Sequence, residues 1–286
     1  MLCFFVSDLH GHQHRYEHLF TRIVEEVPDA VFLGGDLLPS HARSAAGLYP
    51  PVTDFIDEYF AVRFRRLKEE MGERYPRVFL IFGNDDPRVH EAQILDESYK
   101  GLWTYLHNTN LPWREYALGG YAYVPPTPFQ RKDWERYDVS RYLEPGCIAP
   151  EDGRHSVPLD ARELRYRTIQ EDLAELTAEM DVPSSIMLFH SPPYKTKLDR
   201  AALDGKMIDH APLDVHVGSV AIKRFIEQRQ PLITLHGHIH ESASITGEWK
   251  EQIGRSWCYS AAHNGRELAL VRFDPAHPED AKRELC

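Results

Sequence analysis

Residues of types that bind transition metals occur in five short motifs along the chain. These residues are Asp8, His10, Asp36, Asn84, His190, His238 and His240. They supply two carboxylates, four imidazoles and one amide oxygen. This mixture of oxygen and nitrogen donors suits divalent manganese, iron, zinc or nickel, and manganese is the ion that we expect first.

The size of this set predicts two ions rather than one. Seven ligands are too many for a single tetrahedral zinc ion. They fit two ions about 3.5–4 Å apart that share one carboxylate. Such a pair can hold a bridging hydroxide as a nucleophile at neutral pH and can stabilise the charge that develops on a phosphoryl group. We therefore expect hydrolysis of a phosphate ester by attack of that hydroxide.

The spacing within each motif is compatible with a loop that follows a strand. In such a loop residues i and i+2 can face the same cavity, as Asp8 with His10 and His238 with His240 would. Glycines adjoin the ligands, and glycine lets the backbone turn sharply and approach a neighbour closely. These glycines are Gly34, Gly35, Gly83 and Gly237.

Apolar segments that contain or precede the motifs predict the strands that position them. The segments are 2–7, 31–36, 77–86, 184–193 and 231–240. Amphipathic helices are expected at 14–26 and 53–71, so the chain alternates strand and helix as a parallel sheet requires. In open α/β sheets the site lies beyond the carboxyl ends of the strands. The ligands are therefore expected to meet at one edge.

The remaining segments are less regular. Alternation of apolar and polar residues at 114–125, around Gly119 and Gly120, predicts an antiparallel hairpin, and a helix is expected at 161–180. Near the end of the chain we expect three antiparallel strands, at 243–247, 255–260 and 267–273. Residues 126–160 hold many prolines, charges and turn residues, so we expect a surface insertion within a single domain that spans 1–286.

Composition limits the partners. No apolar run approaches the roughly 20 residues of a membrane helix, so no membrane partner is expected. The formal net charge of -11 disfavours binding to duplex nucleic acid. The four cysteines are scattered along the chain, which is typical of a reducing compartment, and we expect the protein in the cytoplasm.

The motifs resemble those of the calcineurin-like metallophosphoesterase superfamily. The segments that carry the resemblance are SDLHG at 7–11, GGD at 34–36, GND at 83–85, His190 and GHIH at 237–240, in the order of that superfamily. It implies a four-layer α/β/β/α sandwich of two mixed β-sheets flanked by helices, with a dinuclear metal centre. The pattern assigns one ion to Asp8, His10 and His240. It assigns the other to Asn84, His190 and His238, with Asp36 as the bridge.

Further segments resemble one branch of that superfamily, the Icc-related predicted phosphoesterases. They are PTPF at 126–129, HSPPYKTKLD at 190–199, HVGS at 216–219 and GHIHES at 237–242. Members of this branch are mostly without an assigned substrate. The resemblance to the branch therefore sharpens the expected fold more than the expected function.

The third motif departs from the superfamily pattern at Asp85. Many members carry a histidine there, near the leaving-group oxygen, as the proposed general acid. Aspartate is ionised at neutral pH and is a poor proton donor. Either its surroundings protonate Asp85, or His12 or His216 donates the proton, or the substrate needs no acid. The last case favours good leaving groups such as aryl phosphates, or phosphodiesters.

These alternatives define the predicted roles. Asn84, Asp85 and His216 are the candidate catalytic residues. His12, Asn84 and His216 are the candidate substrate contacts. The basic stretch at 131–141 is either part of a substrate lid or a solvated surface.

Three functions are compatible with the sequence. The first is a phosphoesterase acting on a small-molecule or nucleotide phosphomonoester or phosphodiester. The second is a metal-dependent nuclease on small or single-stranded nucleic acid. The third is a metal-binding scaffold with little catalysis, for which the aspartate at position 85 is the argument. The full set of ligands favours an enzyme, since decayed enzymes usually lose ligands first.

Overall fold

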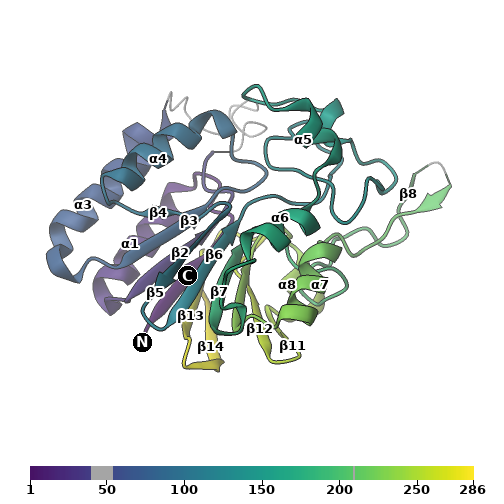
Figure 1. Ribbon diagram of the computed structural model, residues 1–286. Coiled ribbons are helices and arrows are strands. Elements are labelled where there is room, and N and C mark those ends of the chain that lie inside the picture. The colour runs from purple at the N-terminus through teal and green to yellow at the C-terminus, as the bar shows by residue number, and fades with distance from the viewer. Residues whose placement is uncertain (40–53, 209) are drawn as a thin grey trace.

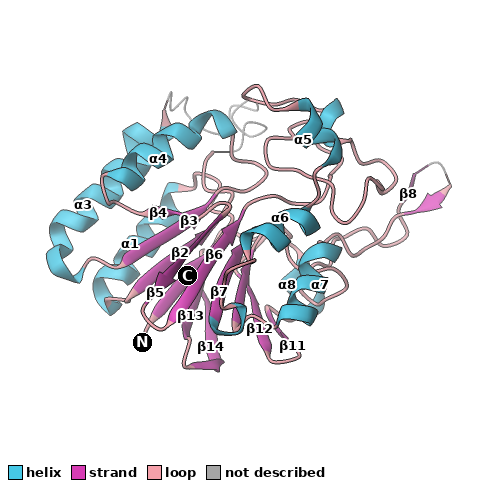
Figure 2. Ribbon diagram, in the orientation of Figure 1, coloured by secondary structure: helices cyan, strands magenta, loops and turns pink. Residues whose placement is uncertain are grey.

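The structure is a computed structural model that describes residues 1–39, 54–208 and 210–286. Within these residues, two six-stranded mixed sheets pack face to face, and helices flank them on the outside (Figure 1, Figure 2). The four-layer α/β/β/α sandwich expected from the sequence is confirmed. None of the helices in the described ranges combines the length and the apolar character needed to cross a membrane.

The first sheet has the strand order β14-β13-β1-β2-β3-β4. Its strands are β1 (Cys3–Val6), β2 (Ala30–Gly34), β3 (Arg77–Ile81), β4 (Thr104–Tyr105), β13 (Ala269–Asp274) and β14 (His277–Leu285). β1 to β4 are parallel, whereas β13 is antiparallel to both β1 and β14. All residues of β1 and β2 are buried, which explains why these strands are continuous apolar runs without alternation.

The second sheet has the order β11-β12-β10-β7-β6-β5. Its strands are β5 (Thr109–Trp113), β6 (Tyr116–Tyr121), β7 (Ser185–Phe189), β10 (Ile233–His236), β11 (Lys250–Ile253) and β12 (Ser256–Ser260). The four central strands are parallel and the two edge strands are antiparallel. Aromatic rings join the two sheets: the Trp113 ring lies 6.1 Å from that of Phe32 and 5.7 Å from that of Phe79.

Helices flank the two sheets on opposite sides (Figure 1). Beside the first sheet lie α1 (Gln13–Glu26), α3 (Ala61–Met71) and α4 (Glu91–Tyr99). Beside the second lie α6 (Ile169–Leu176), α7 (Val220–Arg229) and α8 (Ser242–Thr246). A π-helical turn at Ile56–Phe60 leads into α3, and residue 53, the expected start of that helix, lies outside the described residues. Short 3-10 turns occur at Gly72–Arg74, Arg88–His90, Pro150–Asp152 and Val182–Ser184.

The segment expected as one helix at 161–180 forms two helices, α5 (Ala161–Tyr166) and α6. The chain breaks at Arg167, whose backbone is extended. Thr168 then starts α6 through a capping box with Glu171, in which each side chain bonds the backbone N–H of the other. A capping box satisfies N–H groups that have no helical partner, and it fixes a helix start within the apolar pattern.

The three strands expected near the end of the chain are only partly correct. Residues 243–246 fall in α8, not in a strand. β12, near 255–260, is antiparallel to β11 as expected but parallel to β10 on its other side, and β13, near 267–273, is antiparallel to both of its neighbours. The hairpin near 114–125 is formed by β5 and β6, so Gly119 and Gly120 lie inside β6 and not in its turn. A side chain at Gly119 would meet Met187, and one at Gly120 would meet Leu106. Close packing therefore requires these glycines.

Residues 125–160 run between the sheets and α5 mainly as loops, with a protruding two-stranded hairpin, β8 (Met207–Ile208) and β9 (Ala211–Pro212), further along the chain (Figure 1). That residues 126–160 are an insertion in a single domain stays a prediction.

Candidate metal centre

The ligand motifs follow the carboxyl ends of five parallel strands, three in the first sheet and two in the second. Backbone hydrogen bonds connect the loops within each sheet. In the first sheet, the Asp8 N–H donates to the Gly35 carbonyl over 3.0 Å, and the His10 N–H donates to the Asp36 carbonyl over 2.8 Å. In the second, the Gly237 N–H donates to the His190 carbonyl over 2.9 Å. The site thus lies where the edges of the two sheets meet.

Four of the ligand residues have left-handed backbone conformations. The φ angles are 57° at Asp8, 47° at His10, 52° at Asp36 and 73° at His238. Such values are uncommon outside glycine, and each is unfavourable by about 1–2 kcal/mol. Their clustering indicates that the surrounding contacts impose the loop shape.

Two glycines allow the loops to approach the ligands. A side chain at Gly83 would collide with the carboxylate of Asp36. One at Gly237 would collide with Ser7 and the carboxylate of Asp8. These positions therefore accept no larger residue without displacing a ligand.

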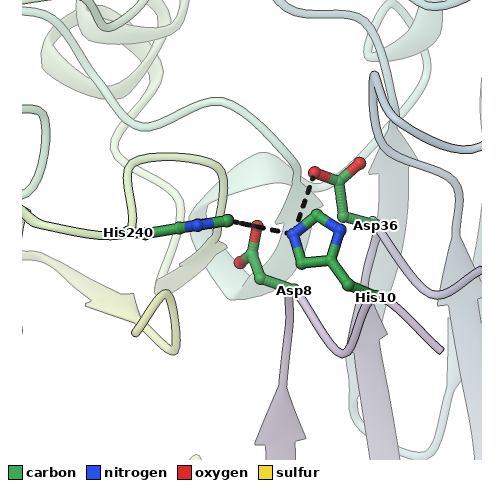
Figure 3. A group of neighbouring side chains, drawn as sticks. All are labelled: Asp8, His10, Asp36 and His240. Carbon is green, nitrogen blue, oxygen red and sulfur yellow. Dashed lines mark hydrogen bonds and ion pairs between the residues drawn. The ribbon is translucent and has the colours of Figure 1, made fainter. Parts of the chain in front are cut away.

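One half of the site brings together Asp8, His10, Asp36 and His240 (Figure 3). One donor atom of each lies within 4.8 Å of those of the others. His240 Nε2 lies 3.1 Å from His10 Nε2 and 3.1 Å from Asp8 Oδ1. The backbone N–H of His238 donates to the Asp8 carboxylate over 3.0 Å, which fixes its orientation.

The other half is formed around His190, which is fully buried. Its Nε2 lies 3.1 Å from Asn84 Oδ1 and 3.4 Å from Asp36 Oδ2. Its Nδ1–H donates to the Gly34 carbonyl over 2.8 Å, so Nε2 is the nitrogen directed into the site, where it can bind a metal once it is deprotonated. The His238 ring packs against it with centroids 5.1 Å apart.

Charge and burial shift the titration of these groups in opposite directions. Burial disfavours protonation of His190, but Asp36 raises its pKa to about 9. Burial likewise disfavours the charged form of Asp8, yet the hydrogen bond from His240 lowers its pKa to about 2. His190 and His10 hold the pKa of Asp36 well below its usual range against the same burial. For His238, burial and the nearby His190 lower the pKa to about 3.

Asp85 lies beside this site as a half-buried residue. Its Oδ2 is 3.4 Å from His10 Nδ1, and its backbone N–H donates to Asp36 Oδ1 over 2.8 Å. Arg131 donates to its carbonyl over 2.9 Å. Asp85 is therefore in contact with two ligand residues and with the segment that carries Arg131.

The other two residues predicted to contact the substrate, His216 and His12, have different positions relative to the cavity. His216 lines the same cavity as the ligands, and its Nδ1–H donates to Asp199 Oδ1 over 2.8 Å. His12 is the N-cap residue of α1, and its ring contacts His14 at 5.4 Å. Within the described part of the chain, His12 is not among the residues that line the cavity.

Asp199 is a fully buried carboxylate whose role was not predicted from the sequence. It accepts the backbone N–H groups of Lys195, Thr196 and Gly218 over 2.9–3.1 Å in addition to His216. Its segment was recognised as HSPPYKTKLD, but nothing in that pattern assigned a function to the final aspartate.

Asp86 and Arg15 support the ligand loops and were also not predicted. The buried Asp86 accepts the backbone N–H groups of Leu37, Leu38 and Gly83 over 2.8–3.1 Å. Arg15 donates to the Asp8 carbonyl over 2.6 Å. The adjacent pair Asp85-Asp86 is the signal that could have identified Asp86, since buried acids commonly accept backbone bonds in loops.

The donor set fits two divalent ions. Two buried carboxylates, four imidazoles and one amide oxygen converge from both sheets. Among them, Asp36 Oδ2 faces both halves, 3.7 Å from His10 Nε2 and 3.4 Å from His190 Nε2. Donor atoms of the buried Asp8 and Asp36 carboxylates lie within 4.8 Å of each other. Two negative charges this close in a buried site need positive charge beside them.

A cavity of about 960 Å³ opens from this centre. Its near end is lined by Asp85 and by five of the seven candidate ligands, which are His10, Asp36, Asn84, His238 and His240. Its far end is lined by residues of two segments, 125–147 and 194–218. The site therefore combines a metal-binding edge with a space much larger than a phosphate group.

Comparison with known proteins agrees with this fold. Residues 1–242 match the family model described as calcineurin-like phosphoesterase. One solved crystal structure superimposes with a TM-score of 0.61 at 17% identity, over 99% of this chain and 98% of the other. The protein TT1561 of Thermus thermophilus gives 0.58 at 17% identity, over 99% and 98%. Similarity at this level shows the fold alone. No curated protein matches the sequence.

Proposed function

Because the chain belongs to the calcineurin-like phosphoesterase family, we propose that it hydrolyses a phosphodiester or phosphomonoester with two divalent transition-metal ions. Membership makes it a hydrolase of phosphoester bonds. The observation that carries the proposal is the position of Asp36, whose Oδ2 lies between His10 and His190. A carboxylate oxygen between two groups of ligands is what a shared ligand of two ions requires.

The contacts between the proposed ligands divide them into two sets, one for each ion. Asp8, His10 and His240 would hold one ion. Asn84, His190 and His238 would hold the other, and Asp36 would belong to both. Manganese is the proposed ion, and the bound pair would supply Lewis acidity toward the phosphoryl oxygens and an activated water.

The ligand residues are held in orientation by their neighbours. The Gly34 carbonyl accepts the Nδ1–H of His190 and so directs Nε2 into the site. The His238 N–H orients the Asp8 carboxylate toward His240. Asp85 contacts Nδ1 of His10, which is the arrangement of a carboxylate that orients a metal-binding histidine. We propose this orienting role for Asp85 in place of proton donation.

His216 is the proposed proton donor to the leaving group. Its Nδ1–H is taken by the buried Asp199, so Nε2 is the nitrogen that is free to exchange a proton with a substrate in the cavity. A His216→Gln variant should lose more activity on alkyl leaving groups than on p-nitrophenyl ones, since good leaving groups need no acid. Equal losses on both would contradict this role.

Metal reconstitution tests the function itself. Protein stripped with chelator should hydrolyse neither bis-p-nitrophenyl phosphate nor p-nitrophenyl phosphate, and it should regain activity when about two manganese ions per chain are bound. Metal content is measured on the same samples. Full metal loading without hydrolysis of any monoester or diester would leave only the scaffold interpretation.

A further inference from the structure

The cavity beyond the metal centre is lined mainly by apolar side chains. Val139 and Leu143 of the segment 125–147 belong to this lining, as do Leu203, Ile208 and Leu213 of the segment 194–218. A phosphate on the metals would occupy only the near end of the 960 Å³ space. The far end is therefore available to a second part of the substrate, and its lining determines the chemistry of that part.

Few of the described residues that line the cavity carry positive charge. Among the described lining residues, Arg131 and Arg224 are the arginines and no lysine is present. Arg131 is bound to the Asp85 carbonyl, and Arg224 donates to Gln170 over 3.3 Å. Lining carboxylates outnumber them: Asp138, Glu144, Asp214 and Glu241. This lining disfavours polyphosphates and the phosphate backbone of nucleic acid.

Two aromatic side chains of the lining are also exposed to solvent. Phe129 is 63% exposed and Tyr142 is 68% exposed, and both line the cavity. Exposed aromatic rings beside an apolar pocket commonly mark a binding site. They extend the apolar surface from the interior of the cavity to its mouth.

The segment 125–147, which forms one wall of the cavity, is fixed in place by buried polar contacts. Lys132 and Glu135 form a fully buried ion pair, and Glu135 also accepts the Thr127 hydroxyl over 2.6 Å. Asp138 accepts the hydroxyl of Ser219 and the N–H of Val220 at the start of α7, both over 2.6 Å. The apolar residues of this segment are thus held in position without a ligand, which lowers the cost of binding.

We propose that the substrate is a phosphate ester of an apolar alcohol, whose alkyl or aryl group occupies the space between segments 125–147 and 194–218. This inference rests on the proposed function, because it assumes that the phosphate lies at the metals. It predicts that such esters are hydrolysed in preference to nucleotide and oligonucleotide esters. Alkyl and aryl groups share the chemistry that the lining recognises, and the experiment separates them.

A series of p-nitrophenyl phosphodiesters tests the proposal. The second ester group is methyl, butyl, octyl, naphthyl or thymidinyl, so that the leaving group is constant. On manganese-loaded protein, kcat/KM should rise by at least about tenfold from methyl to butyl, since each buried methylene contributes roughly fourfold. A larger gain for octyl than for naphthyl identifies an alkyl chain, and the reverse identifies an aromatic ring.

A matched pair of variants locates the effect. Leu143→Asn should lower the ratio of the butyl to the methyl kcat/KM by about fivefold. Leu95→Asn, at a leucine on α4 that is 37% exposed, should leave that ratio as in the unchanged protein. The ratio does not depend on the fraction of active protein, so partial unfolding of a variant does not alter it.

Binding provides a readout without turnover. Butylphosphonate should bind metal-loaded protein at least about tenfold more tightly than methylphosphonate in calorimetry. A flat series in both hydrolysis and binding, or a preference for the thymidinyl ester, would overturn the substrate proposal while leaving the phosphoesterase intact. Chain-length-dependent binding without hydrolysis of any ester would instead overturn the proposed function and retain the apolar site.

Discussion

At the metal end of the cavity the ligands stand directly after strands and carry buried charge, whereas the far end is formed by long loops and apolar side chains. Asp8 and Asp36 at the near end contact histidines across the two sheets. At the far end, the buried Asp199 and the partly buried Asp138 accept backbone N–H groups and shape loops. With the roles proposed for the two ends, reaction chemistry would depend on strand ends and substrate selection on loops.

Loss of Asp36 should give the largest effect. Asp36→Asn removes the charge that both halves share, so hydrolysis of bis-p-nitrophenyl phosphate should fall at least about 10³-fold. Metal analysis should show fewer bound ions. Glu69→Gln, at an exposed position on α3, is the matched control with unchanged turnover. If Asp36→Asn kept both ions and full activity, the near end of the cavity would not be the metal-binding end.

Breaking the buried ion pair of the far wall should give the next largest effect. Glu135→Ala leaves Lys132 buried without its partner, which should lower the free energy of unfolding by about 3 kcal/mol. Urea denaturation measures this change. The ratio of butyl to methyl ester turnover should fall as the wall loosens, while about two ions per chain remain bound.

The exposed pair of Lys197 and Glu248 supplies the control. Lys197→Ala should change the free energy of unfolding by less than about 1 kcal/mol. An equal loss in both variants would show that burial does not distinguish these ion pairs.

Changing the pH should alter metal binding at the near end and leave apolar binding at the far end unchanged. The expected change in affinity is smaller than the loss of activity on replacing Asp36. Asp36 raises the pKa of His190 from the usual 6.5 to about 9. This raised pKa stabilises metal-stripped protein below pH 6.5, and the contribution is lost as the pH rises through 9. A metal must displace that proton, so manganese affinity should increase by about tenfold per pH unit between roughly pH 7 and 8.5.

Calorimetry in buffers of different ionisation enthalpy measures the released proton. The butyl-to-methyl binding ratio of the phosphonates should stay constant over the same range, since an apolar contact does not titrate. Metal affinity that is independent of pH would remove His190 from the ligand set.

Removal of Arg131 should give the smallest effect. Arg131→Gln loses the charge-assisted bond between the far wall and the Asp85 carbonyl, which should lower kcat/KM by about threefold for methyl and butyl esters alike. Arg165→Gln, on the short helix α5, is the control. A loss confined to the butyl ester would instead assign Arg131 to substrate selection.

The two ends also differ in how well the sequence predicted them. The convergence of the candidate ligands was predictable because each stands a few residues beyond an apolar strand, and the carboxyl ends of parallel strands meet at one edge. Asp199 was not predictable, because a carboxylate that accepts backbone N–H groups leaves no periodic pattern. The role of Asp86 was missed although the adjacent pair Asp85-Asp86 was visible in the sequence.

The errors in secondary structure have local causes. Thr168 and Glu171 have the spacing of a capping box, so the break between α5 and α6 was visible in the sequence but was overridden by the apolar pattern. Residues 242–246 are too few to distinguish alternation from helical periodicity. Gly119 and Gly120 predicted a turn, because the close packing that requires them depends on Met187 and Leu106, distant in sequence.

The left-handed backbone at Asp8, His10, Asp36 and His238 has a consequence for selection experiments. Glycine adopts this conformation without penalty, so at these positions the backbone alone favours a residue that cannot bind metal. A library of variants selected only for thermal resistance in chelator should therefore accumulate glycine there. Such a selection would recover more durable proteins that have lost their chemistry, whereas a selection with manganese present would reject the same substitutions.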